Sequence, residues 1–181
     1  MSDRDLLAQI LQPNAVIPLI KEYKDRFNVE LVEPSVPGSK LTIRGCPSDC
    51  LVINVDDCFD NSRVFNGNSG VGKRADYILI SEEKKKVLFI EMKKSSSGGG
   101  NIIKQLKGSL CFFEYCKKIL EHFLSSKPCF GGYDLRFVSF KHTTIPKRKI
   151  SANKSTKRHD TPETLLKISH TQFSEFAKLA A

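Results

Sequence analysis

Three charged residues stand at the ends of two apolar segments near the middle of the chain. Asp76 lies at the start of the segment ADYILI at 75–80, and Glu91 and Lys93 end a second segment, VLFIEMK at 87–93. Both segments are rich in apolar and β-branched residues, which predicts strands, and the link SEEKKK between them is short enough for a hairpin. The first residue of one hairpin strand lies beside the last residues of its partner, and residues two apart share a face. The three charges are therefore predicted to meet at one end of a sheet.

This set of side chains suits metal-assisted hydrolysis of a phosphodiester. Two facing carboxylates repel each other unless a cation lies between them, and hard divalent cations prefer oxygen ligands. The metal polarises the phosphate and acidifies a water, while a neighbouring lysine positions or activates that water. The alternative is a hairpin that ends in a surface ion pair between Lys93 and Asp76 or Glu91, which contributes little to stability.

The positive charge of the chain is concentrated in one segment. The sequence has 29 Lys and Arg residues against 20 Asp and Glu, a net charge of +9 with a pI near 9.3. Residues 141–158 hold seven of the bases and no acid: Lys141, Lys147, Arg148, Lys149, Lys154, Lys157 and Arg158. A focused basic segment is typical of polyanion binding, because each neutralised phosphate releases counterions. A solvated basic loop without a partner is the alternative.

Length and composition predict a single globular domain. The chain has 181 residues, of which 40% are hydrophobic and 27% charged, values typical of a folded domain with its own core. No apolar run approaches the length of a membrane span, and the N-terminal segment has acids where a secretory signal has bases. We therefore expect one domain over 1–181, with a core at about 51–140, a basic arm at 141–158 and short elements at 160–181. The expected location is the cytoplasm, without membrane contact.

Six cysteines raise the question of a disulfide or metal framework. In a reducing cytosol we expect free thiols rather than disulfides. The first three form a C-x3-C-x7-C run that could supply three zinc ligands, but zinc sites more often use paired C-x2-C motifs. Cys111 and Cys116 lie in an apolar stretch and are predicted to be buried. A cysteine-based zinc protein stays open as a competing hypothesis.

The remaining elements are predicted from periodicity. Helical spacing over 3–27, divided by Pro13 and Pro18, favours two helical pieces, and 101–124 has one broad apolar helical face with Asn101 as N-cap. Strands are predicted at 40–44, 51–55 and 135–140, a loop at 60–72, a flexible loop at 95–100, and a helix within 169–179. This order predicts an α/β fold with a mixed sheet flanked by helices.

One phosphate-loop match is rejected. Residues 67–73 fit G-x4-G-K, but the loop also needs a Ser or Thr after the lysine and a following helix. Arg74 and a predicted strand follow instead. Lys73 and Arg74 are better candidates for simple phosphate contacts.

A pattern in the middle of the chain resembles the PD-(D/E)XK nuclease superfamily, the restriction-endonuclease-like fold. It consists of RADYILI, the charged link and VLFIEMKK, followed by a helix that carries Gln105. The resemblance covers about half of the chain and implies an αβββαβ core. It implies that Asp76 and Glu91 bind Mg²⁺ or Mn²⁺ with the main-chain carbonyl of Met92, that Lys93 is catalytic, and that Gln105 lies near the active site.

The chain departs from the superfamily pattern at two positions, and three other acids come into question. Ala75 stands where the motif has proline, and Ser109 where a tyrosine usually follows the glutamine. Glu22 is the candidate for an acid from the first helix, with a simple helix-surface role as the favoured interpretation. Asp56 and Asp57 follow the predicted strand 51–55 and could border the site, although Asp at such positions usually has turn or cap chemistry.

The function predicted from these features is a divalent-metal-dependent nuclease, with DNA as the favoured substrate and RNA not excluded. The proposed nucleic-acid contacts are made by Lys73, Arg74, Lys147, Arg148, Lys149, Lys154, Lys157 and Arg158. A non-cleaving nucleic-acid-binding module on the same fold is the alternative. Because the chain has little room for a specificity domain, targeting is expected from a homodimer or from a second protein that targets or activates the enzyme. In this superfamily, small nucleases often serve host defence or DNA processing.

Overall fold

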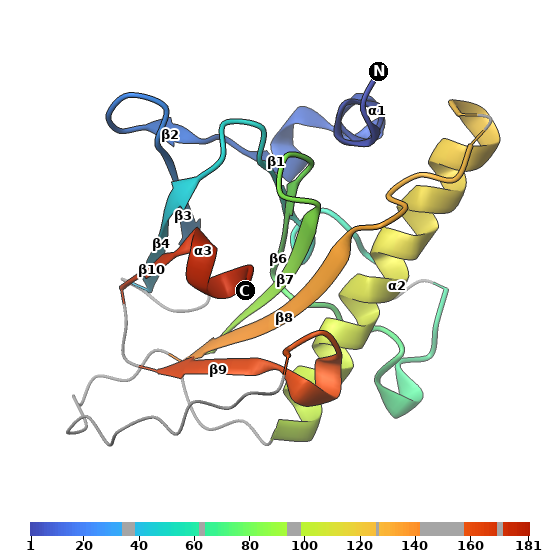
Figure 1. Cartoon of the computed structure of the whole chain (residues 1–181). Coiled ribbons are helices and arrows are strands. Elements are labelled where there is room, and N and C mark those ends of the chain that lie inside the picture. The colour runs from blue at the N-terminus through green and yellow to red at the C-terminus, as the bar shows by residue number, and fades with distance from the viewer. Residues whose placement is uncertain (34–38, 62–63, 94–98, 126, 142–157, 170–171) are drawn as a thin grey trace.

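The computed structural model describes the chain except for residues 34–38, 62–63, 94–98, 126, 142–157 and 170–171 (Figure 1). Within the described residues, a six-stranded sheet has the order β1-β5-β6-β7-β8-β9. Its strands are β1 (Val16–Ile17), β5 (Leu51–Asn54), β6 (Tyr77–Ser81), β7 (Lys86–Lys93), β8 (Asp134–Lys141) and β9 (Leu166–Ser169). The mixed α/β fold class is confirmed.

The centre of this sheet is a meander followed by a helical crossover. β5, β6 and β7 pair antiparallel in chain order, which confirms the predicted hairpin between β6 and β7. Helix α2 (Gly99–Phe123) then returns the chain so that β8 pairs parallel to β7. A parallel neighbour needs such a crossover, and the long apolar face of the predicted helix provides it.

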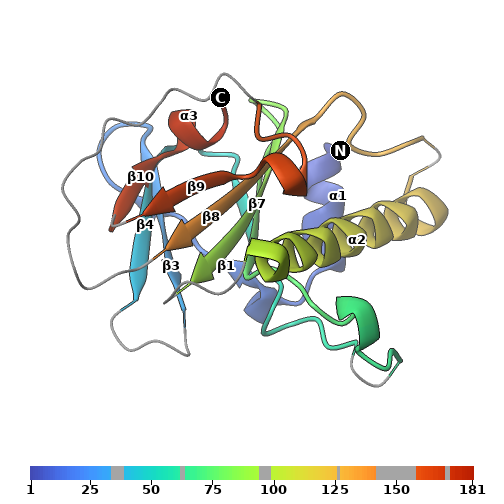
Figure 2. The same ribbon diagram turned by 90° about the horizontal axis from the view of Figure 1, so that it is seen from below.

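The central strands are buried on both faces, so their sequences are continuously apolar instead of alternating. On one face, Ile78 and Phe89 pack with α2 and with α1 (Asp3–Ile10). On the other face, Leu79 and Leu88 pack against a second sheet. Figures 1 and 2 show this sheet beside the six-stranded one, on the side away from α2. Its strand order is β10-β4-β3-β2, with β2 (Ile20–Lys21), β3 (Phe27–Val32), β4 (Lys40–Cys46) and β10 (Phe173–Glu175). The sequence prediction missed this second sheet.

Three of the predicted helical features are wrong in part. Within 3–27 only α1 is an α-helix, and it ends at Ile10, before both prolines. A 3₁₀ turn, η1 (Pro13–Ala15), and two short strands follow it, and the apolar residues on either side of Pro18 pair with β5 and β3. Asn101 is not an N-cap, since α2 begins at Gly99. Most of 169–179 is extended, and helix α3 (Phe176–Leu179) is a single turn.

Other predictions concern the loops and termini. The strands predicted at 40–44, 51–55 and 135–140 are confirmed as β4, β5 and β8. The loop predicted at 60–72 is confirmed in its described residues, 60–61 and 64–72, except for the 3₁₀ turn η2 (Asn68–Gly70). A second 3₁₀ turn, η3 (Pro162–Thr164), precedes β9. Most of the loop predicted at 95–100 lies outside the described residues. In the part of the chain that the structure describes, no helix is both long and apolar enough to span a bilayer.

Candidate active site

The register of the β6–β7 pair brings Asp76 and Glu91 together. Tyr77 lies opposite Ile90, so the next step of the antiparallel register places Asp76 opposite Glu91. Beyond the paired residues, the main-chain N–H of Met92 donates a 2.5 Å hydrogen bond to Oδ2 of Asp76. The two carboxylates therefore stand side by side where β6 begins and β7 ends, as the sequence predicted.

The alternation of side chains points both carboxylates toward α2. Ile78 and Phe89, each two residues from one of the acids, pack in the core beneath that helix. Lys93, two residues after Glu91, shares the same face. The three charged groups of the motif are thus presented on the helix-covered face, and not toward the second sheet.

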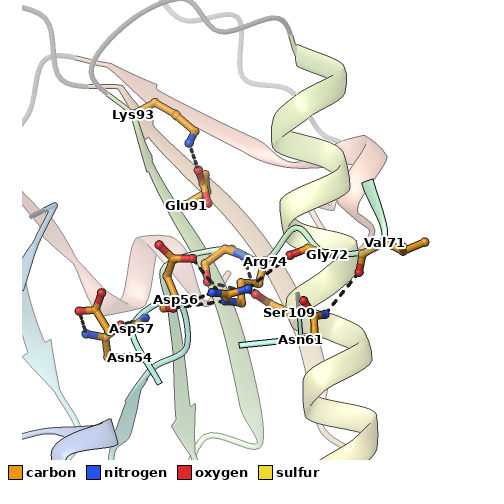
Figure 3. Close-up of polar contacts among 11 residues, drawn as sticks. Asn54, Asp56, Asp57, Asn61, Val71, Gly72, Arg74, Glu91, Lys93 and Ser109 are labelled. Atoms are coloured by element: carbon orange, nitrogen blue, oxygen red, sulfur yellow. Dashed lines mark hydrogen bonds and ion pairs between the residues drawn. The ribbon is translucent and has the colours of Figure 1, made fainter. Parts of the chain in front are cut away.

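Glu91 is the most constrained of these groups. Its side chain has no exposed surface, and its Oε1 lies 2.5 Å from Nζ of Lys93, an ion pair visible in Figure 3. Apart from this lysine, the two carboxylate oxygens have no polar partner among the described residues. A fully buried carboxylate with a single partner is costly to the fold, and a bound cation would lower that cost.

Burial and mutual repulsion set the protonation of the two acids. Burial, followed by the charge of Glu91, raises the pKa of Asp76 to about 8, although the Met92 N–H opposes the shift. Burial raises the pKa of Glu91 to about 7 against the lowering effect of Lys93. Burial lowers the pKa of Lys93, but the neighbouring acids raise it more, so the lysine is cationic. Without a metal, the pair holds protons near neutral pH.

We expect the metal-free protein to lose stability as pH rises from 6 to 8. Both carboxyl groups bind protons more tightly when folded than when unfolded, so the folded state is favoured below their folded pKa values and this advantage disappears as pH rises through about 7 to 8. The loss should be about 2 kcal/mol in urea denaturation with EDTA. Asp76→Asn should flatten the slope. Other titrating groups, such as the buried His159, whose pKa is lowered by burial, are common to both proteins and cancel in the comparison. A wild-type slope equal to that of the variant would contradict the assignment.

Helix α2 fixes the start of β6 through a small contact. The hydroxyl of Ser109 accepts a 2.7 Å hydrogen bond from the N–H of Ala75 and donates a 3.2 Å bond to the carbonyl of the same residue. On the other edge of β6, the N–H of Val55 donates to the carbonyl of Asp76. The main chain around Asp76 is therefore held from both sides, and Ser109 has a structural role.

Arg74 is engaged within the protein. Its guanidinium donates hydrogen bonds to the main-chain carbonyls of Asp56, at 3.0 and 3.3 Å, and of Gly72, at 3.3 Å, and lies 3.4 Å from the Asp56 carboxylate (Figure 3). Asp57 closes a turn with Asn54 through two hydrogen bonds, which agrees with turn chemistry. Arg74 and Asp56 together brace the loop that borders the site.

The other predicted site residues differ in their exposure and in their contacts. Lys73 is exposed and bonds to the side chain of Asn101. Gln105 is half-buried on α2, with a buried Oε1 that has no hydrogen-bond partner among the described residues. Lys141 pairs in register with Lys93, so two cations stand at neighbouring strand ends. Arg158 is exposed, whereas Lys147, Arg148, Lys149, Lys154 and Lys157 lie outside the described residues.

The positions of two acids, Glu22 and Glu33, differ from the prediction. Glu22 is not on the first helix: it follows β2 in the second sheet and lines a polar pocket there with Asp25 and Arg44. Glu33, which the sequence analysis missed, raises the pKa of both Asp76 and Glu91. It lies close to the site because β3 ends there, and no local pattern could reveal this contact between two sheets.

The end of β3 is tied directly to β6. The hydroxyl of Tyr77, the residue after Asp76, donates a 2.5 Å hydrogen bond to the carbonyl of Val32 and accepts one from its N–H. Burial raises the pKa of this tyrosine, which keeps it a donor. The second sheet therefore contributes to the boundary of the site.

The donor set fits a hard divalent cation with few protein ligands. Within the described ranges, no group of three or more His, Cys, Asp or Glu side chains could hold a metal. Asp76 and Glu91 supply two carboxylates, and the Met92 N–H faces Asp76. In a strand, the carbonyl of a residue points to the same edge as its N–H, so the Met92 carbonyl also faces the edge of β7 on which Asp76 lies. Water would complete the shell, as is usual for Mg²⁺.

The cysteines and the glycine-rich segment take no part in this site. All six cysteines are free thiols; Cys116 is buried as predicted, but Cys111 is exposed because it points to the outer side of α2. After the glycine-rich segment 67–73 the chain enters β6 and not a helix, which confirms that the phosphate-loop context is missing. No family model, no curated protein and no solved structure matches this chain.

Proposed function

We propose that the protein is a divalent-metal-dependent nuclease with a restriction-endonuclease-like core. The observation that carries the proposal is the fully buried Glu91, which stands opposite Asp76 and has the Nζ of Lys93 as its single polar partner among the described residues. A structural ion pair needs only one carboxylate near the lysine. A second carboxylate directly opposite is unfavourable unless a cation is bound.

The order of elements supports the same proposal. Strands β5, β6 and β7, helix α2 and strand β8 follow one another as a βββαβ series, and helix α1 precedes this series with strands β1 to β4 in between. Asp76 and Glu91 lie at the start of β6 and near the end of β7. Apart from the inserted strands, this is the order of elements that the resemblance implies.

In the proposed reaction, each residue has a defined task. Asp76, Glu91 and the Met92 carbonyl would hold Mg²⁺ or Mn²⁺, and the ion would polarise the phosphate and lower the pKa of a water. Lys93 has a cationic Nζ beside Glu91, so it can orient that water or stabilise the negative charge that develops on phosphate. Gln105 offers an unsatisfied amide oxygen near the same face of the sheet.

The substrate and setting follow from charge and from the resemblance. DNA is the favoured substrate, RNA is the alternative, and the basic residues of 141–158 with Lys73 are proposed to bind the backbone without reading sequence. A homodimer or a second protein would supply targeting or activation. We propose a cytoplasmic role in defence or DNA processing.

The decisive experiment is cleavage of linear, circular and single-stranded DNA and of RNA with Mg²⁺, Mn²⁺ or EDTA. We expect metal-dependent cleavage by the wild type and a loss of at least about 100-fold in Lys93→Ala. The matched control is Lys118→Ala, which removes another lysine paired with a glutamate, Glu121, at 2.6 Å on the surface of α2. Its activity should stay within about twofold of wild type.

Two outcomes would contradict the proposal. Equal cleavage by wild type and Lys93→Ala would place the chemistry elsewhere. Binding without cleavage in every metal, with and without candidate partner proteins, would favour the non-cleaving nucleic-acid-binding module.

A further inference from the structure

An open groove lies along the outer side of α2, apart from the candidate metal site. Its volume is about 740 Å³, and its walls are α2 and the described part of the 59–71 loop. Figures 1 and 2 show this loop, with the short turn η2, standing beside the helix and away from the sheets. The helix residues that line the groove include Lys104, Gly108, Phe112 and Tyr115, which recur at helical spacing and share one face.

The groove is lined by aromatic rings that are accessible to solvent. Phe59 packs against Phe112 with ring centroids 4.8 Å apart and against Tyr115 at 6.5 Å. Tyr115 is 56% exposed, and Phe65 on the opposite wall is 50% exposed. Aromatic faces that remain exposed in a cluster indicate a binding surface rather than part of the core.

Basic side chains stand at one end of these rings. Lys104 and Lys107 line the groove about two to three helical turns before Tyr115, and Lys107 also pairs with Glu163 at 2.6 Å. Asp60 lies on the opposite wall. Flat aromatic faces beside cationic groups fit a ligand that has both planar rings and negative charge, which is the chemistry of a nucleotide chain.

The groove and the candidate site share one helix. Lys104 precedes Gln105, and Gly108 precedes Ser109, whose hydroxyl holds Ala75 beside Asp76. A strand that leaves the metal site along α2 would therefore meet this groove.

We propose that this groove binds the unpaired bases of a single-stranded nucleic acid by stacking on Tyr115 and Phe65. The inference rests on the proposed nuclease function and specifies its substrate: the strand next to the cleavage site is unpaired. Bases inside a duplex are stacked on each other, so their faces are hidden from protein rings, whereas a single strand offers every base. Stacking on any base is possible, so the groove has little sequence preference.

The test is fluorescence anisotropy in EDTA with a labelled oligothymidine of about 12 nucleotides and with a duplex of the same length. We expect Tyr115→Ala and Phe65→Ala each to weaken single-strand binding about tenfold and to change duplex binding by less than about twofold. The matched controls are Phe123→Ala on the same helix, where the ring is 79% exposed, and Tyr23→Ala, where it is 70% exposed. Both controls should bind like wild type, and thermal melting verifies that every variant is folded.

The results separate this inference from the nuclease proposal. Unchanged single-strand affinity in both groove variants would overturn the groove assignment, and would make an acidic apolar peptide the better candidate, whatever the cleavage assays show. Equal weakening by Phe123→Ala or Tyr23→Ala would also overturn it. Weakening confined to Tyr115→Ala and Phe65→Ala would support the groove even if the wild type cut no substrate, because the assay contains no metal.

Discussion

Glu91→Gln is expected to remove metal-dependent cleavage, by about three orders of magnitude, and at the same time to make the metal-free protein more stable. The loss of activity follows from the loss of one of two carboxylates that face the same point. Glutamine keeps the shape of the side chain but has only one neutral oxygen to offer a cation. Affinity for Mn²⁺, measured by calorimetry, should fall with the activity.

The gain in stability comes from removing a buried charge. Glu91 has no exposed surface, and the ion pair with Lys93 does not compensate for its burial, because its pKa stays raised to about 7. Removing one member of a buried pair usually destabilises the partner left behind. Here Lys93 keeps 23% of its side chain exposed and can turn to water. The net gain at pH 8 in EDTA should be about 1 to 2 kcal/mol.

The control for this prediction is Glu121→Gln, which breaks an exposed ion pair and should change both activity and stability very little. Urea denaturation with and without Mg²⁺ measures the second effect. If Glu91→Gln lowered stability in EDTA and left cleavage intact, the carboxylate would be a structural ion-pair partner. A rise in the stability of the metal-free protein together with a loss of cleavage is specific to a site that is strained without its metal.

The core of the candidate site could be predicted because its geometry is local. Asp76, Glu91 and Lys93 lie in two strands joined by a short link, so pairing and side-chain alternation alone place them together. The same holds for the length of α2, where apolar spacing marks one face. Such features depend only on residues that are neighbours in the sequence.

The surroundings of the site could not be predicted, because they depend on contacts between distant segments. Glu33 approaches the carboxylates only because Tyr77 bonds to the end of β3. The spacing of the apolar residues in 16–21 fits a helix, and only pairing with β5 and β3 makes them strands. Tertiary partners decide between helix and strand for short apolar runs. In the sequence, the exposed aromatic residues of α2 are likewise not distinguishable from its buried apolar residues.

Gly108→Ala is expected to disturb the fold more than alanine at any other glycine that the structure describes. A Cβ at this position would lie 1.6 Å from the main-chain carbonyl oxygen of Lys73, a distance that no side-chain rotation can relieve. Helix α2 and the segment that leads into β6 must then separate. We expect a loss of about 3 kcal/mol, or about 10 °C in melting temperature.

The same helix contains a matched control. Gly100→Ala adds the same methyl group to α2 where no atom lies within 4 Å, so it should stabilise the helix by up to about 1 kcal/mol. Melting curves of the two variants compare an identical chemical change with opposite expected signs. If both glycines tolerated alanine equally, the close contact between α2 and the start of β6 would be wrong.

The effect of Gly108→Ala should extend from stability to cleavage. Ser109, the next residue, holds Ala75 by two hydrogen bonds, and Asp76 follows directly. Moving the helix outward breaks these bonds and displaces one carboxylate from the other, and a displacement of about 1 Å is enough to reduce catalysis about 100-fold. The folded fraction of Gly108→Ala at low temperature should therefore bind Mn²⁺ more weakly and cut more slowly than wild type. Full activity in that fraction would mean that Asp76 is positioned by β5 and β7 alone, without the helix.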